Sequence, residues 1–289
     1  MMQVEHLKKA TFGSIVTGVD LENLDETTWG KLYNLWIERA LLIFPRAFLS
    51  AEGQDILALR FGDIEFPRTA ISNIGKDEKL HHESSDDVVK VLRGNEGWHH
   101  DSTYMPIQAK AAIFCAEIVP DSGGETGWAD MRAAYEALDE TVRVKVENLK
   151  AYHSYYYSQG RDGYLPNEQN EDGTYNYYGF HDHEVSLRPL VKVHPETGLK
   201  NLIIGRHAHD IIGMSKEESQ NFLDDLNEFA CSGSRVHYHY WEPGDAVVWD
   251  NRRLMHRATP YDMTEQRRMW HTRIAGDTQT EAALNHQPS

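Results

Sequence analysis

The sequence contains only two cysteines, Cys115 and Cys231, among its 289 residues. This number is too small for a disulfide framework, and their apolar neighbours suit reduced thiols better. A zinc site built on thiolates is excluded as well. No apolar run approaches the roughly 20 residues that a bilayer-spanning helix needs, so we do not expect an integral membrane protein.

Positive charge is also scarce. The chain has 29 Lys and Arg residues against 45 Asp and Glu residues, a formal net charge of −16. Such a charge repels phosphate backbones and anionic membrane surfaces, so we expect neither nucleic acid nor a membrane as a partner. A small anionic substrate stays compatible, because a few buried Arg or Lys side chains set the potential inside a pocket. The first residues show no basic segment leading into an apolar stretch, so we expect no secretory signal and a cytoplasmic location.

The length and ordinary composition favour one domain over residues 1–289. Helical periodicity is confined to a few segments: residues 26–40, 50–60 with Ser50 as a cap, 131–150 and 215–231. Strand-like runs dominate after Trp98 and occupy residues 111–119, 190–194, 201–204, 235–240, 246–249 and 268–274, with 14–21 and 41–44 before them. This pattern predicts a mainly β fold, a β-sandwich or jelly roll with helical insertions. Residues 152–179 read as one long loop, so about 151–180 is expected to be a lid or active-site loop.

The segment Trp98-His99-His100-Asp101 presents a candidate metal site. If it is extended, His99 and Asp101 point to the same side and His100 points away. A second imidazole would complete a two-His, one-carboxylate triad, which leaves positions for a bidentate oxo-acid and dioxygen. His256 is the candidate for that imidazole, because a strand-like run precedes it and a basic segment follows.

His-x-Asp alone is weak evidence in a chain with 16 histidines. The triad gains support from Arg267 and Arg268, which follow His256 at +11 and +12. A guanidinium can bind the far carboxylate of 2-oxoglutarate through two parallel hydrogen bonds. Two other classes stay open: a cupin-type metal enzyme that uses His237 and His239 without 2-oxoglutarate, and a jelly roll that binds metal without catalysis.

Several longer segments resemble one known family, the taurine dioxygenase and 2,4-dichlorophenoxyacetate dioxygenase family, and within it the S-selective phenoxypropionate dioxygenases. The segments are residues 98–106, 123–126, 130–138, 189–198, 204–209, 249–252 and 269–276. The resemblance extends from Phe44 to about Ala283. It implies a double-stranded β-helix and an Fe(II) enzyme that consumes 2-oxoglutarate and O2.

The resemblance also implies roles for particular residues. His99, Asp101 and His256 would bind the iron. Thr126 and Arg267 would bind 2-oxoglutarate, with Arg268 as the neighbouring alternative. The family's second arginine, which meets a substrate anion, is replaced by His271, so Arg273 on the same face is the next candidate. His207 and Asn95 are further substrate-binding candidates.

The reaction expected from this likeness is hydroxylation of a small carboxylate-bearing substrate such as an aryloxyalkanoate. Hydroxylation of a carbon beside an ether oxygen gives an unstable product, so cleavage can be the net result. The same chemistry on a sulfonate or sulfate ester is the alternative. The natural substrate, its stereochemistry and any homo-oligomer are not determined by the sequence.

Overall fold

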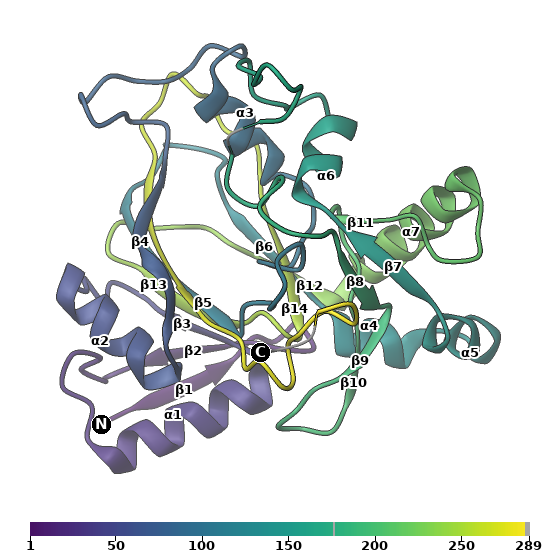
Figure 1. Cartoon of the computed structure of the whole chain (residues 1–289). Coiled ribbons are helices and arrows are strands. Elements are labelled where there is room, and N and C mark those ends of the chain that lie inside the picture. The colour runs from purple at the N-terminus through teal and green to yellow at the C-terminus, as the bar shows by residue number, and fades with distance from the viewer. Residues whose placement is uncertain (176, 287–289) are drawn as a thin grey trace.

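The computed structural model describes residues 1–175 and 177–286, and two β-sheets face each other at its centre (Figure 1). The larger sheet has seven strands in the order β1 (Gln3–His6), β2 (Ser14–Thr17), β3 (Leu41–Phe44), β13 (Ala246–Asp250), β5 (Ala111–Ile118), β15 (Arg268–Ile274) and β4 (Ile64–Ser72). The smaller sheet has the order β12 (Val236–His239), β6 (Thr126–Asp130) and β14 (Leu254–Ala258). The predicted jelly roll with helical insertions is confirmed.

The inner faces of the two sheets enclose an aromatic core. Trp128 of β6, Trp249 of β13 and Phe114 of β5 belong to one buried cluster, and the rings of Trp128 and Trp249 lie 5.8 Å apart. All five residues of β13 are buried, because this central strand is covered on both faces. The core fills one end of the space between the sheets and leaves the other end for polar side chains.

The outer face of the large sheet is covered by two helices, α1 (Glu26–Arg39) and α2 (Ala51–Phe61). Leu32 and Trp36 of α1 and Leu57 of α2 pack with Val248 of β13 in a second core cluster. The predicted cap is present, since the Ser50 hydroxyl accepts a hydrogen bond from the Gly53 N–H at 2.9 Å. These two helices therefore bury the outer face of the large sheet.

A third group of elements packs beside the small sheet and encloses its own apolar cluster. Its helices are α4 (Met131–Ala137), α5 (Glu140–Glu147) and α7 (Lys216–Ala230), and a 3-10 turn, η1 (Gly233–Arg235), follows α7. Its strands form the sheet β11 (Ala208–His209), β7 (Lys150–His153), β8 (Ser186–Pro189) and the pair β9 (Val191–Val193), β10 (Lys200–Leu202). The insertions predicted at 131–150 and 215–231 are thus helical, the first as two helices.

The expectation of one long loop over 152–179 is wrong in its first part. The end of β7 lies there, followed by α6 (Tyr155–Arg161), which the Ser154 hydroxyl caps by accepting from the Tyr157 N–H at 3.1 Å. Residues 162–175 and 177–185 have no helix or strand, and Asn176 lies outside the described residues. The rest of the segment that the sequence predicted as a loop packs through Phe180 against Tyr104 and Tyr155.

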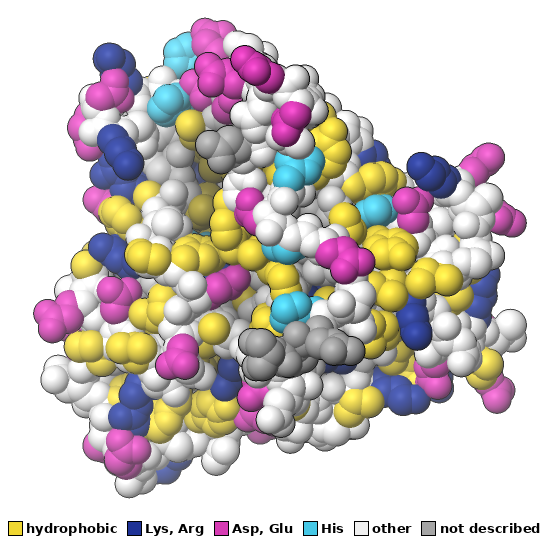
Figure 2. All heavy atoms as spheres, viewed as in Figure 1, with side chains coloured by type: hydrophobic (Ala, Val, Ile, Leu, Met, Phe, Trp, Pro, Cys, Tyr) yellow, Lys and Arg dark blue, Asp and Glu magenta, His cyan; other side chains and the backbone are white. Residues whose placement is uncertain are grey.

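A further helix, α3 (Asp87–Gly94), leads into the His99 segment and was also not predicted. It begins after an acidic stretch, and acidic side chains gather at the top of the face in Figure 2, where this part of the chain lies. Asp86 caps it by accepting from the Val88 N–H at 2.8 Å. In the described residues, no helix has the length and apolar character needed to cross a membrane.

Candidate metal and substrate site

His99, Asp101 and His256 come together at the open end of the space between the sheets. Their ligand atoms all lie within 4.8 Å of one another, and all three residues are buried. A short antiparallel bridge joins the two histidines, with His99 N–H donating to His256 O at 2.9 Å and His256 N–H donating to His99 O at 2.7 Å. The predicted triad residues are therefore neighbours in space, although 157 positions separate the first from the last.

Asn251 fixes the turn that carries Asp101. Its Oδ1 accepts from the Asp101 N–H at 2.7 Å, and its Nδ2 donates to Asp101 O at 2.9 Å. His100 Nδ1 donates to Asn251 O at 2.7 Å, so this ring points away from the metal group as predicted. Sequence reasoning missed this role; the only signal was the position of Asn251 within the segment 249–252.

The protonation states suit a metal. His99 Nδ1 lies 2.8 Å from Gly97 O, which can only accept, so Nδ1 carries the proton and Nε2 is free to bind. Burial lowers the pKa of His99 to about 4, so the imidazole is neutral at pH 7. Burial raises the pKa of Asp101, but the positive charge of Arg273 outweighs it and holds this pKa well below its usual range. Burial also holds the pKa of His256 well below its usual range, so this imidazole is neutral too.

Two polar atoms of the group have no hydrogen-bond partner in the described residues, Asp101 Oδ2 and His256 Nδ1. Buried polar atoms are rarely left unpaired in folded proteins. Two neutral imidazoles and one carboxylate with an unpaired oxygen form the donor set that Fe(II) accepts. The residues present therefore fit a divalent transition metal.

Arg267 lies in the same cavity, of about 60 Å³, which Thr126 and the three triad residues also line. It is 3% exposed, and its Nη2 donates to Gly124 O at 3.0 Å. No carboxylate of the described residues lies within 4.0 Å of this guanidinium, and burial lowers its pKa to about 10. A buried cation without a counter-ion fits the carboxylate of a ligand. Thr126 Oγ1 accepts from Trp241 Nε1 at 3.0 Å.

Arg268 does not share this position, which corrects the alternative raised by the sequence. Successive side chains of β15 point to opposite faces, so Arg268 lies on the outer face. Its guanidinium is 3.4 Å from Glu78 and 3.6 Å from Glu117. Only Arg267 of the pair lines the cavity.

The two candidates for a substrate anion both contact Asp101. Arg273 Nη2 donates to Asp101 Oδ1 at 3.0 Å, and His271 Nε2 lies 3.5 Å from Asp101 Oδ2. Both side chains line the cavity, but neither stands free in it. Arg273, the predicted anchor of a substrate anion, is already paired with a carboxylate of the protein.

A second cavity of about 180 Å³ adjoins the metal group and is lined mainly by aromatic rings. The rings are those of Phe66, Tyr104, Tyr155, Tyr177 and Tyr178. Asn95 at the end of α3 and His207 line it as well, as predicted for substrate contacts. His207 Nδ1 is 2.8 Å from Ser158 Oγ, and burial holds the pKa of this ring well below its usual range, so His207 offers no positive charge.

The rival metal site at His237 and His239 is contradicted. His239 Nε2 lies 2.9 Å from Asp245 Oδ2, so a carboxylate of the protein already pairs with this ring. Among the described residues, His99, Asp101 and His256 lie close enough together to hold a metal ion, and no such group of three includes His237 or His239.

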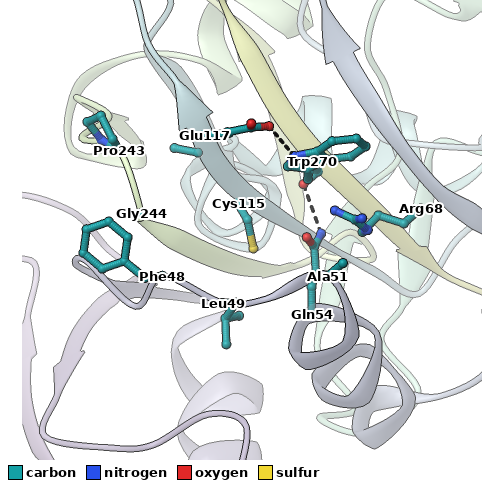
Figure 3. A pocket seen from close by; sticks show the side chains of 11 residues that line it. Phe48, Leu49, Ala51, Gln54, Arg68, Cys115, Glu117, Pro243, Gly244 and Trp270 are labelled. Carbon is teal, nitrogen blue, oxygen red and sulfur yellow. Dashed lines mark hydrogen bonds between the residues drawn. The ribbon is translucent and has the colours of Figure 1, made fainter. Parts of the chain in front are cut away.

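A larger cavity of about 370 Å³ lies on the outer face of β5 and β15 (Figure 3). Trp270 forms one wall, donating through Nε1 to Glu117 at 2.6 Å and accepting at its backbone oxygen from Gln54 at 3.0 Å. The metal group lies against the opposite face of these strands, in the cavity that Phe114 and His271 also line. Size therefore does not locate the chemistry here; the donor set does.

Comparison with known proteins agrees with this geometry. Residues 3–274 match the model of the family described as "Taurine catabolism dioxygenase TauD, TfdA family". The (S)-phenoxypropionate/alpha-ketoglutarate-dioxygenase of Sphingobium herbicidovorans is 56% identical over 96% of both chains, and that of Delftia acidovorans is 50% identical over 95% of both. The crystal structure of AAD-2 in complex with Mn(II) and N-oxalylglycine superposes with a TM-score of 0.89 at 34% identity, covering 99% of this chain and 100% of the other.

Proposed function

The chain belongs to the TauD, TfdA family of dioxygenases and is an α-ketoglutarate-dependent dioxygenase, and we propose that it binds Fe(II) at His99, Asp101 and His256. The resemblance noted in the sequence is thereby confirmed. One observation carries the proposed site: a neutral two-His, one-carboxylate group and a buried arginine without a counter-ion line the same small cavity. With 2-oxoglutarate bound, Fe(II) supplies oxidative decarboxylation of the oxo-acid coupled to hydroxylation of a substrate carbon.

The protein's own residues position the reactants. Arg267 would bind the far carboxylate of 2-oxoglutarate through its fork of N–H donors, with Thr126 beside it. Asn251 would keep Asp101 in register with the two imidazoles. The tyrosines around the second cavity would exclude water from the reacting carbon.

The proposed prime substrate is an aryloxyalkanoate. The aromatic walls of the 180 Å³ cavity suit a planar ring, and the relatives that are 56% and 50% identical are named for (S)-phenoxypropionate. Hydroxylation beside the ether oxygen would release a phenol and a keto acid. Both cysteines are free, which supports a reducing, cytoplasmic location.

Succinate release tests the proposal. The purified protein would be given Fe(II), 2-oxoglutarate and a panel of aryloxyalkanoates, taurine and alkyl sulfates. We expect substrate-stimulated succinate and phenol with the (S)-aryloxypropionates and none from a His99→Ala variant. Full turnover by His99→Ala would sink the metal assignment, and stimulation by taurine or alkyl sulfates alone would replace the aryloxyalkanoate with a sulfur oxyanion substrate.

A further inference from the structure

The guanidinium of Arg273 is enclosed by polar groups of the protein. Its Nη2 donates to Asp101 Oδ1 at 3.0 Å, its Nη1 donates to Ser102 Oγ at 2.9 Å, and its Nε faces Glu65 Oε2 at 3.8 Å. The face of the guanidinium lies 4.8 Å from the centre of the Phe66 ring. Both terminal nitrogens of Arg273 are therefore hydrogen-bonded to the protein, and Glu65 supplies a second carboxylate near Nε.

Ser102 connects Glu65 to Arg273, and its backbone is strained. Its φ is +56°, in the left-handed region that non-glycine residues seldom adopt. This conformation directs the hydroxyl between two strands of the large sheet, where it donates to Glu65 Oε1 at 2.8 Å and accepts from Arg273. Strain of this kind persists only where the surroundings impose it, and it gathers at functional sites.

The two charged residues that Ser102 contacts lie on adjacent strands of the large sheet. Glu65 lies on β4 and Arg273 on the adjacent β15, where Arg273 is paired with Phe66. Glu65 does not line the substrate cavity, so it stands behind Arg273 as seen from the substrate. The order from the metal outward is Asp101, then Arg273 with Ser102, then Glu65.

We propose that Glu65, Ser102 and Arg273 form a positioning unit for Asp101, the metal-binding carboxylate, and that Arg273 is not the anchor of the substrate anion. Because Arg273 occupies Oδ1, Asp101 presents Oδ2 as its single free oxygen, 3.9 Å from His256 Nε2. A substrate anion would compete for Arg273 with two carboxylates of the protein, those of Asp101 and Glu65. This inference rests on the proposed metal site, and it assigns a role to Glu65, which lines neither cavity of the candidate site.

Metal affinity tests the unit without any turnover. The full-length protein, freed of metal by chelation, would be titrated with Mn(II), and free Mn(II) would be followed by its electron paramagnetic resonance signal. Loss of a group that orients a metal ligand costs about 10- to 100-fold in affinity, so we expect that loss for Arg273→Met. We expect a smaller loss, about threefold or more, for Glu65→Gln, which keeps the shape and removes the charge, and partial recovery for Arg273→Lys.

Controls separate positioning from general damage. Glu117→Gln, on the outer face of β5, should bind Mn(II) as the wild type does, and circular dichroism would report the folding of each variant. The proposal is overturned if folded Arg273→Met and Glu65→Gln bind Mn(II) within twofold of the wild type. It is also overturned if Arg273→Met raises KM tenfold for an aryloxyalkanoate but not for its neutral amide, with unchanged Mn(II) affinity.

Two further results remain informative. If Arg273→Met does not fold, the Mn(II) affinity of Glu65→Gln decides alone: a loss supports the unit and an unchanged value overturns it. If the wild type binds Mn(II) but releases no succinate with any aryloxy acid, the proposed substrate fails. The affinity comparison still decides the positioning unit in that case.

Discussion

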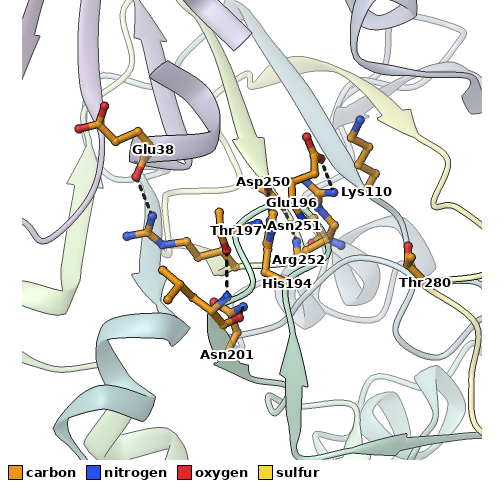
Figure 4. A network of polar contacts seen from close by, with 12 residues as sticks. Glu38, Lys110, His194, Glu196, Thr197, Asn201, Asp250, Asn251, Arg252 and Thr280 are labelled. Carbon is orange, nitrogen blue, oxygen red and sulfur yellow. Dashed lines mark hydrogen bonds and ion pairs between the residues drawn. The ribbon is translucent and has the colours of Figure 1, made fainter. Parts of the chain in front are cut away.

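In the described part of the chain, two buried clusters of arginine, carboxylate and histidine can be compared. They differ in how many of their polar atoms have a hydrogen-bond partner within the protein. The cluster at the end of β13 is closed (Figure 4). Arg252 donates to both oxygens of Asp250 at 2.9 and 2.6 Å and to Glu196 at 2.7 Å, while His194 lies 3.0 Å from Asp250. None of these four side chains has an unpaired buried atom in the described structure.

The cluster around Asp101 is open. Asp101 Oδ2, His256 Nδ1, His271 Nε2 and Arg267 Nε all lack partners among the described residues. The first cluster needs nothing from outside the chain, whereas the second has unpaired donors and acceptors on residues that line one small cavity. The closed cluster stabilises the fold, and the open one is built to bind.

Breaking the closed cluster should have the largest effect. Arg252→Met would leave the carboxylate of Asp250 buried without its cation, and removing one partner of a buried pair costs about 3–5 kcal/mol. We expect that loss in the free energy of unfolding, measured by urea denaturation. Arg60→Met, which removes an ion pair with the exposed Glu26, should cost at most about 1 kcal/mol. Equal losses in the two variants would contradict the comparison.

The opposite result is expected for the open cluster. Arg267→Met removes a buried charge that no carboxylate of the described residues balances, so the free energy of unfolding should be unchanged or higher. Two charge-assisted hydrogen bonds to 2-oxoglutarate would be lost, at about 1.5 kcal/mol each or more, so KM for 2-oxoglutarate should rise on the order of 100-fold.

Arg268→Met is the matched control for this prediction. It changes the adjacent residue on the outer face of β15 and should alter KM for 2-oxoglutarate by less than about twofold. A large rise in Arg268→Met with none in Arg267→Met would show that the neighbouring register is the correct one.

The elements with a clear apolar pattern were predictable from the sequence. The runs at 111–119 and 268–274 are strands β5 and β15 within one residue, and Ser50 caps α2 as its position indicated. Helix α6 was missed because Tyr155-Tyr156-Tyr157-Ser158-Gln159-Gly160-Arg161 has no apolar periodicity. Strand β4 was missed because it is an edge strand that contains Pro67, and proline in a run argues against a strand except at an edge.

The candidate site divides in the same way. His99, Asp101, His256 and Arg267 were predictable because their residue types and spacing reflect the metal and oxo-acid chemistry. Their supporting residues were not, since Asn251 meets Asp101 across 150 positions and Ser102 meets Glu65 across 37. Such contacts depend on tertiary packing. For the same reason the pairing of Arg273 with Asp101 was not predicted, because the two residues lie 172 positions apart in the sequence.

His153 sharpens the comparison, because it shows that unpaired polar atoms alone do not make a site. Its two ring nitrogens have no partner in the described residues and it is fully buried, yet it lines neither cavity of the candidate site. Burial holds the pKa of its imidazole well below the usual 6.5, so the folded protein keeps the ring neutral where the unfolded chain takes up a proton. Keeping His153 neutral therefore costs no stability above pH 6.5. Below pH 6.5 the free energy of unfolding falls as the pH drops, because only the unfolded chain takes up the proton.

Replacing His153 with Phe removes this dependence. The difference in unfolding free energy between His153→Phe and the wild type should shift in favour of the variant by about 2 kcal/mol from pH 7.5 to pH 5.0, since each pH unit below 6.5 contributes about 1.4 kcal/mol. Changes in packing are the same at both pH values and cancel, and His82→Phe at an exposed position controls for the loss of a histidine. Urea denaturation of the metal-free protein measures both. A pH-independent difference would mean that His153 has a hydrogen-bonding partner, such as a buried water, and that this region is closed like the cluster at Asp250.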